Sequence, residues 1–153
     1  MDIRDFLSPS CTTIGVRASD KTRLLRDLGQ RAATMLGLSA EDVTAALLQR
    51  EALGSTGTGG GVAVPHARLQ GLAKAFGMLV RLDKAIDFAA IDDQKVDVVC
   101  LLLLPAQAHG DQLNALAAVA RTLRDPQTAK RVRAAPDDAA LYRAMTAGAG
   151  KPV

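Results

Sequence analysis

The sequence predicts a single domain of the α/β class. Its 153 residues are a usual length for one domain, and 48% hydrophobic with 23% charged residues is a globular composition. Stretches with helical spacing of apolar residues alternate with short apolar or β-branched stretches. We find no internal repeat and no linker long enough to divide the chain. This alternation predicts helices layered on a sheet.

The first third of the chain is predicted to form one strand and two helices. We expect a strand at 11–18, a helix from Ser19 or Asp20 to about Leu38, and a second helix from Ser39 that Gly54 stops. The strand stretch is rich in β-branched residues. Each helix begins after a residue whose side chain accepts hydrogen bonds from the first free backbone amides.

The remaining chain continues the alternation. We expect strands at 62–64, 75–82 and 96–104, followed by a helix at 111–123. Apart from Asp97, the stretch 96–104 is apolar, which is typical of a strand buried on both faces of a sheet. Pro126 and Pro136 divide the C-terminal third into short helical pieces. We therefore expect a domain at 1–147 and a flexible C-terminal tail at 148–153.

Composition argues against nucleic acid as a partner. Lys and Arg exceed Asp and Glu by 19 to 16, a net charge of only +3, which is too small for a surface that binds polyanions. Aromatic residues make up 3% and Trp is absent, although proteins that hold single strands usually stack bases on aromatic rings. The basic stretch from Arg121 to Arg133 is interpreted as a solvated face.

Several features predict a cytoplasmic protein. The longest apolar run, 98–106, is far short of the ~20 residues of a membrane-spanning helix, so we expect no membrane insertion. The N-terminus has no apolar signal core. Cys11 and Cys100 form no motif, and two lone thiols fit a reducing compartment.

The loop from Gly54 to Gly61 is the most informative segment. Five of its eight residues are glycine and the others are Ser or Thr. Such a backbone can take positive φ values and surround an anion with its amides. No Gly-Lys-Ser/Thr follows, and Val62 stands where a dinucleotide fingerprint needs its third glycine. The loop therefore predicts an anion site, and both familiar nucleotide motifs are absent.

His66 follows this loop and is the predicted nucleophile. Pro65 ends the preceding strand and holds His66 at a rigid exit. About three-quarters of imidazoles with the ordinary pKa near 6.5 are neutral at pH 7, so a lone pair is available for attack on phosphorus. Arg68, two residues on, shares a face with His66 if the chain stays extended. Arg50 lies 16 residues upstream, at the end of the predicted helix, and either guanidinium could bind phosphate oxygens.

The stretch from Arg50 to Arg68, REALGSTGTGGGVAVPHAR, resembles the active-site signature of enzyme IIA components of the mannitol/fructose class. These belong to the bacterial phosphoenolpyruvate-dependent phosphotransferase system. The similarity is greatest to the nitrogen-regulatory branch, whose pattern is R-E-x-x-G-S-T-G-x-G-x-G followed by a short apolar strand and Pro-His. It extends from Ile3 to Tyr142.

The resemblance implies a mixed β-sheet flanked by helices and a phosphocarrier with a regulatory role. A small HPr-like phosphocarrier protein would donate a phosphoryl group to His66, at Nε2 in the family, and Arg50 would stabilise it. Ser55, Thr56, Gly57, Gly59, Gly60 and Arg68 are expected to contact the phosphoryl group. The resemblance implies no metal and no dissociable cofactor.

One departure from the family concerns a second histidine near the active one. The family places it near the start of the helix after the central apolar strand, and aligning Leu113 and Leu116 with that helix puts Gln112 at the position. Gln112 could donate a hydrogen bond to a phosphoryl oxygen. His109 either reaches the site from one turn earlier or is an ordinary exposed loop residue.

Two other functions remain as alternatives. The chain could be a sugar-specific IIA component that passes its phosphoryl group to a permease domain. It could also be a binding module that keeps the fold and carries no phosphate. The intact Arg50, glycine-rich loop and His66 favour phosphoryl acceptance over the last of these.

Overall fold

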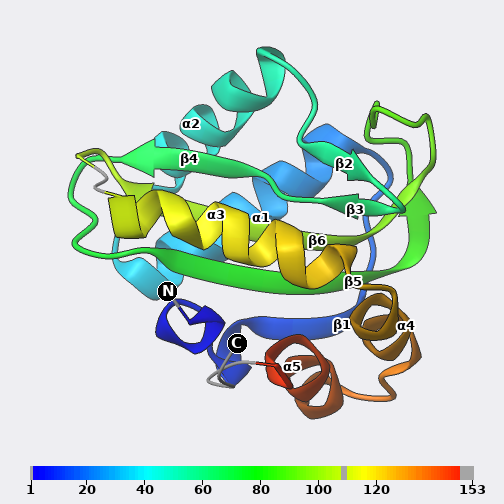
Figure 1. Cartoon of the computed structure of the whole chain (residues 1–153). Coiled ribbons are helices and arrows are strands. Elements are labelled where there is room, and N and C mark those ends of the chain that lie inside the picture. Colours follow the sequence, from blue (N-terminus) through cyan, green and yellow to red (C-terminus); the bar gives the residue numbers. More distant parts are fainter. Residues whose placement is uncertain (1, 108–109, 149–153) are drawn as a thin grey trace.

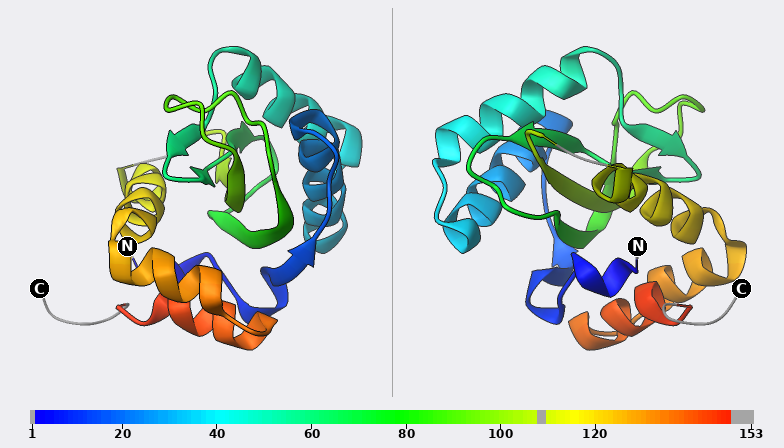
Figure 2. Two further views of the ribbon diagram at one scale, coloured as in Figure 1. Left: turned by 90° about the vertical axis from the view of Figure 1, so that its right-hand side faces the viewer. Right: turned by 60° about the vertical axis from the view of Figure 1, so that its left-hand side comes forward.

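The chain folds as one α/β domain around a mixed six-stranded sheet (Figure 1). The computed structural model describes residues 2–107 and 110–148, without the side chains of Asp111 and Gln112. The strand order is β1-β5-β6-β3-β2, and β4 also pairs with β6. Helices α1 and α2 cover one face of the sheet and α3 covers the other, while α4 and α5 lie beside the β1 edge (Figure 2). The predicted fold class is confirmed.

The strands are β1 (Thr12–Val16), β2 (Gly57–Gly59), β3 (Val62–Ala63), β4 (His66–Leu69), β5 (Phe76–Ile86) and β6 (Val96–Pro105). The helices are α1 (Lys21–Leu36), α2 (Ala40–Ala52), α3 (Gly110–Arg124), α4 (Pro126–Ala134) and α5 (Asp138–Thr146), preceded by short 3₁₀ turns at Ile3–Asp5 and Pro9–Cys11.

Most elements match the sequence prediction. The side chain of Asp20 caps α1 by accepting a hydrogen bond from the Arg23 amide at 2.8 Å, and Ser39 caps α2 in the same way. The pattern did not predict β2, which forms within the glycine-rich loop, and β5 runs further than 75–82. Of the predicted tail at 148–153, only Gly148 lies within the described residues.

The central strand β6 positions the site. All of its residues except Asp97 and Pro105 are buried, as the apolar run predicted. Val62 and Ala63 of β3 pair with Val98 and Val99, and His66 of β4 pairs with Leu102. This offset of 36 residues is the same in both ladders, so β3 and β4 lie as one interrupted strand along β6.

The interruption falls at Val64 and Pro65. Proline has no amide hydrogen to donate to a ladder, but its carbonyl oxygen accepts a hydrogen bond from the Leu102 amide at 2.9 Å. The break therefore does not move the chain away from β6. His66 is the first residue of β4, and all four residues of β4 pair with β6.

No helix of the described residues is long and apolar enough to cross a membrane.

Arg81 of β5 is expected to stabilise the end of α4. Its Nη1 donates to the carbonyl oxygens of Val132 at 2.9 Å and Ala135 at 2.7 Å, where free carbonyls and the helix dipole favour a cation. Replacement Arg81→Met should lower the free energy of unfolding by about 2 kcal/mol, measured by urea denaturation. The control Arg17→Met removes an exposed ion pair with Asp83 and should change it by less than about 0.5 kcal/mol. Equal losses for the two variants would contradict this role.

Candidate functional site

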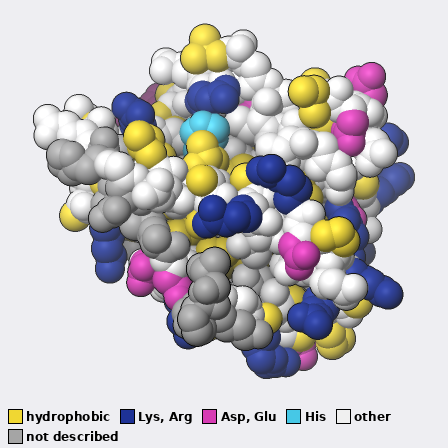
Figure 3. Space-filling view, viewed as in Figure 1, with side chains coloured by type: hydrophobic (Ala, Val, Ile, Leu, Met, Phe, Trp, Pro, Cys, Tyr) yellow, Lys and Arg dark blue, Asp and Glu magenta, His cyan; other side chains and the backbone are white. Residues whose placement is uncertain are grey.

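A surface groove of about 830 Å³ lies between the C-terminal end of α2, strand β4 and the first turns of α3. It brings together three of the predicted residues, Arg50, His66 and Arg68. The other residues that line it are mostly apolar: Ala46, Gln49, Ala52, Leu53, Ala67, Leu104, Leu113 and Leu116. Figure 3 shows a histidine side chain at the surface between basic and hydrophobic side chains.

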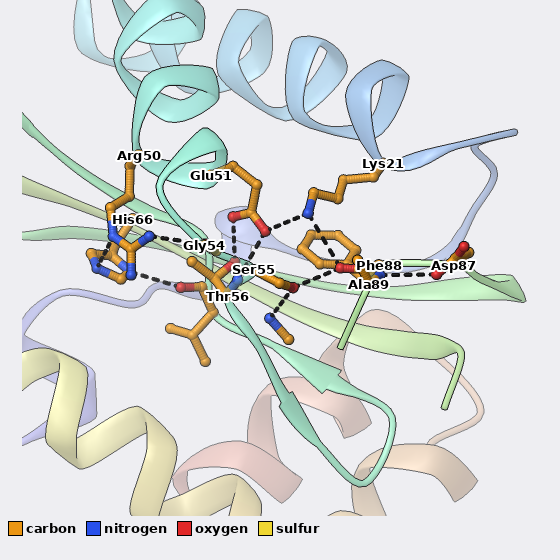
Figure 4. A network of polar contacts seen from close by, with 12 residues as sticks. Lys21, Arg50, Glu51, Gly54, Ser55, Thr56, His66, Asp87, Phe88 and Ala89 are labelled. Carbon is orange, nitrogen blue, oxygen red and sulfur yellow. Dashed lines mark hydrogen bonds and ion pairs between the residues drawn. The ribbon is translucent and has the colours of Figure 1, made fainter. Parts of the chain in front are cut away.

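The imidazole of His66 is half-buried and held at both nitrogens (Figure 4). Nδ1 lies 2.9 Å from the Val64 carbonyl oxygen, and because a carbonyl can only accept, Nδ1 must carry the proton. The Arg50 Nε–H donates to Nε2 at 3.3 Å, and because a guanidinium can only donate, Nε2 must present its lone pair. Both bonds select the same neutral tautomer, with Nε2 as the nucleophilic atom.

Arg50 reaches the imidazole from the last turn of α2. Its Nη1 donates to the Gly54 carbonyl oxygen at 2.9 Å, so the guanidinium is fixed at two points. Among the ion pairs of the described residues, none involves Arg50 or Arg68. Their positive charges are therefore free to attract an anion to the groove.

Arg68 lies in the same groove as His66. Residues 66–69 form strand β4, so positions 66 and 68 project from one face, as the sequence predicted for an extended chain. The Arg68 side chain is exposed. The structure thus brings a second guanidinium to the wall of the groove that holds His66.

Ser55 and Thr56 lie beside this groove, but their hydroxyls bond elsewhere (Figure 4). Ser55 Oγ donates to the Phe88 carbonyl oxygen at 2.6 Å. Thr56 Oγ1 donates to Glu51 Oε2 at 2.7 Å. In this conformation the two hydroxyls therefore fix the backbone of the loop.

The glycines of the loop from Gly57 onward belong to the hairpin of β2 and β3. Gly57 and Gly59 belong to β2, and the Gly60 amide donates to Asp92 Oδ2 at 2.9 Å. That hydrogen bond is the main reason why the pKa of Asp92 lies below its usual value. Gly60 has φ of 66° at the turn, where glycine is favoured. The phosphate contact expected of these residues stays a prediction.

The two candidates near the start of α3 cannot be compared in the structure. His109 lies outside the described residues, and so does the side chain of Gln112, whose backbone belongs to α3. Within the described part of the chain, no group of three or more His, Cys, Asp or Glu residues is placed to hold a metal ion.

Sequence reasoning assigned no role to Glu51 or Lys21, which form an ion pair next to Arg50. Lys21 Nζ is 2.8 Å from Glu51 Oε1, and the side chain of Glu51 is 4% exposed. Glu51 follows Arg50 within the motif, and this position could have indicated that Glu51 belongs to the site. Lys21 is 30 positions away, and nothing in its local sequence indicates the contact.

Comparison with known proteins gives a consistent result. A family model described as "Phosphoenolpyruvate-dependent sugar phosphotransferase system, EIIA 2" matches residues 5–147. A nitrogen regulatory protein of Bradyrhizobium diazoefficiens is 43% identical over 145 residues, covering 95% of each chain. One of Escherichia coli is 38% identical over 153 residues, covering 99% of this chain and 94% of the relative. A fructose-specific EIIA component of Haloferax volcanii is 37% identical over 78 residues, about half of each chain.

Solved structures agree on the fold. The nitrogen regulatory protein IIA-Ntr of Neisseria meningitidis superposes with a TM-score of 0.89 at 30% identity, covering 94% of this chain and 99% of that one. The mannitol IIA structure of Escherichia coli gives a TM-score of 0.72 at 20% identity, covering 91% and 98%. At that identity the second likeness concerns the fold alone.

The hydrogen bonds of His66 predict its tautomer in solution. At a pH of about 8, above the ordinary histidine pKa of ~6.5, long-range ¹H–¹⁵N correlation spectra should show the proton on Nδ1. The variant Arg50→Met should keep that tautomer, because the Val64 carbonyl still selects it. A spectrum dominated by the Nε2–H form would show that this bond does not control the ring.

Proposed function

Because the chain belongs to the EIIA type 2 family of the phosphoenolpyruvate-dependent sugar phosphotransferase system, we propose that it is a regulatory phosphocarrier. It accepts a phosphoryl group on Nε2 of His66 from an HPr-like carrier protein and regulates partner proteins according to its phosphorylation state. The observation that carries the proposal is the unprotonated Nε2 of His66, which lies in an open groove and accepts a hydrogen bond from Arg50.

The chemistry follows from the protonation of the ring. The Nε2 lone pair attacks the phosphorus of the donor's phosphohistidine, and the new N–P bond forms as the donor's N–P bond breaks. The donor imidazole leaves with the electron pair of that bond. The Nδ1 proton stays on His66 and bonds to the Val64 carbonyl oxygen, which stabilises the positive charge that phosphorylation brings to the ring.

The two arginines stabilise the group in transfer. Negative charge spreads over the three equatorial phosphoryl oxygens in such reactions, and catalysis depends mainly on positioning and electrostatics. Arg50 turns its donors from Nε2 to the phosphoryl oxygens, and Arg68 contributes from the exposed side of the groove. Ser55, Thr56, Gly57, Gly59 and Gly60 contact the phosphoryl group in this proposal, and Gln112 and His109 are further donor candidates.

The surface around His66 suits the docking of a protein donor. Leu53 is 85% exposed and Leu113 is 45% exposed, and both line the groove. None of the described side chains lining the groove is a carboxylate. An HPr-like carrier would bury these leucines and bring its phosphohistidine to the basic centre of the patch, where Arg50 attracts the phosphoryl charge.

The regulatory role is favoured over sugar transfer by the extent of similarity. The nitrogen regulatory proteins of Bradyrhizobium diazoefficiens and Escherichia coli match nearly the whole chain, whereas the fructose-specific relative matches about half of it. We place the protein in the cytoplasm, in accord with its two free, buried cysteines. Nothing in the proposed transfer requires a metal or a dissociable cofactor.

Labelling tests the proposal directly. Incubation with phosphoenolpyruvate and purified upstream carriers should add one phosphoryl mass to the intact protein, mapped to His66. His66→Ala should abolish the addition, because the nucleophile is gone, while cooperative thermal unfolding is retained because this half-buried residue serves chemistry. An unlabelled wild type, or a label that persists in His66→Ala, would refute phosphoryl acceptance at this residue.

A second measurement separates regulation from sugar transfer. The labelled protein is incubated with sugar-specific IIB domains and the loss of label is followed. A regulatory carrier should keep its label on the time scale in which a sugar-specific IIA protein, run in parallel, passes its own to a cognate IIB domain. Rapid and complete transfer would favour the sugar-specific alternative.

A further inference from the structure

Glu51, the residue after Arg50, forms a largely buried ion pair with Lys21. Glu51 Oε1 accepts a hydrogen bond from the Thr56 amide at 2.8 Å and forms an ion pair with Lys21 Nζ at 2.8 Å. Glu51 Oε2 accepts one from Thr56 Oγ1 at 2.7 Å. The side chain of Glu51 is 4% exposed and that of Lys21 is 23% exposed. Both carboxylate oxygens therefore have charged or polar partners, and the carboxylate is shielded from water.

Stability alone does not explain this pair. Removing two charges from water is expensive, and well-packed apolar residues often serve the fold equally well in place of a buried ion pair. A charged group differs from apolar side chains because it forms directional hydrogen bonds, and these hold the neighbouring groups in one arrangement. The groups it holds are therefore informative about its role.

Thr56 connects the ion pair to His66. Its amide and hydroxyl bond to Glu51, and its carbonyl oxygen accepts a hydrogen bond from the Val64 amide at 3.0 Å. The Val64 carbonyl oxygen in turn accepts the Nδ1 proton of His66. Hydrogen bonds and the backbone of Thr56 and Val64 thus connect the Glu51 carboxylate to the Val64 carbonyl oxygen. That oxygen sets the tautomer of His66.

The same turn also supports Arg50. Glu51 and Thr56 close the six-residue segment that contains Gly54, and the Gly54 carbonyl oxygen accepts from Arg50 Nη1 at 2.9 Å. Fixing Thr56 against Glu51 therefore fixes the acceptor that aims the guanidinium at His66 Nε2. The Glu51 carboxylate therefore holds the backbone whose carbonyl oxygens orient both Arg50 and His66 (Figure 4).

Lys21 joins the start of α1 to this arrangement. Its Nζ also donates to the Phe88 carbonyl oxygen at 3.2 Å and lies 4.9 Å from the centre of the Phe88 ring. The same carbonyl accepts from Ser55 Oγ. The ammonium thus has a carboxylate, a carbonyl and an aromatic face around it, which holds it in place against Glu51.

We propose that Glu51, held by Lys21, is a positioning residue for phosphoryl acceptance: through Thr56 it fixes the Gly54 and Val64 carbonyls that orient Arg50 and His66. The inference rests on the proposed function and names two residues for it. Neither touches the reacting atoms.

The test compares Glu51→Gln with the double variant Lys21→Met/Glu51→Gln, which leaves no unpaired buried charge and should fold. Small displacements of reacting groups can lower rates about 100-fold. We expect kcat of phosphoryl acceptance to fall about 10- to 100-fold in both variants, with KM for the phosphorylated donor unchanged. Asp27→Asn is the control, because its ion pair with Arg31 is exposed on α1, and it should keep the wild-type kcat.

A spectroscopic readout accompanies the kinetics. The ¹⁵N resonances of Arg50 Nε and His66 Nε2 should shift in both variants and stay in place in Asp27→Asn, because only the former loosen the Arg50–His66 hydrogen bond. Wild-type kcat in the double variant, a rise in KM alone, or unmoved resonances would overturn the inference. If Glu51→Gln does not fold, the double variant decides.

The two proposals fail differently. Absence of label on wild-type His66 would refute the proposed function, whereas the resonances of Arg50 and His66 report on positioning without any phosphoryl transfer. A labelled wild type with a fully active double variant would refute the positioning role and leave the proposed function standing.

Discussion

The Val64 carbonyl oxygen fixes the proton of His66 on Nδ1, and the proposed chemistry at this site depends on that bond. A free imidazole exchanges between two neutral tautomers, and only one of them has a lone pair on Nε2. The acceptor lies two residues before the histidine, in the break between β3 and β4. Pro65 occupies the break, so the residue that interrupts the ladder also separates the acceptor from the side chain it controls.

This local arrangement is only as rigid as the strand that carries it. β6 is buried along nearly its whole length and pairs with β3, β4 and β5. Because β3 and β4 keep one register against β6, Val64 and His66 cannot slide relative to each other without breaking both ladders. The largely apolar run 96–104 thus contributes to function although none of its residues is proposed to react. It holds the Val64 carbonyl and the His66 ring in a fixed relative position.

Much of this could be predicted from the sequence, and the limits have physical reasons. The helices and the central strand follow from apolar periodicity and capping residues such as Asp20 and Ser39. His66, Arg50 and Arg68 stand within one short motif, so their meeting in one groove could be expected. The placement of Gly60 against Asp92 could not, because it depends on how a distant loop folds over the hairpin. The contact of Lys21 with Glu51 joins two helices and has no local signature.

The charges near the site form two separate groups, an ion pair of Lys21 and Glu51 and the two arginines of the groove. Glu51 and Lys21 neutralise each other in a buried layer, so the carboxylate beside Arg50 in the chain does not quench the guanidinium at the surface. Arg50 and Arg68 are left to give the groove two positive charges without a carboxylate among its described lining residues.

A phosphoryl group carries about −1.5 to −2 charges near neutral pH. Under the proposed function the ring also gains a positive charge, so phosphorylation would lower the net charge of the groove only in part, while the apolar rim of Leu53 and Leu113 stays the same. A partner that recognises this face through a carboxylate would bind the unmodified form and be released by phosphorylation.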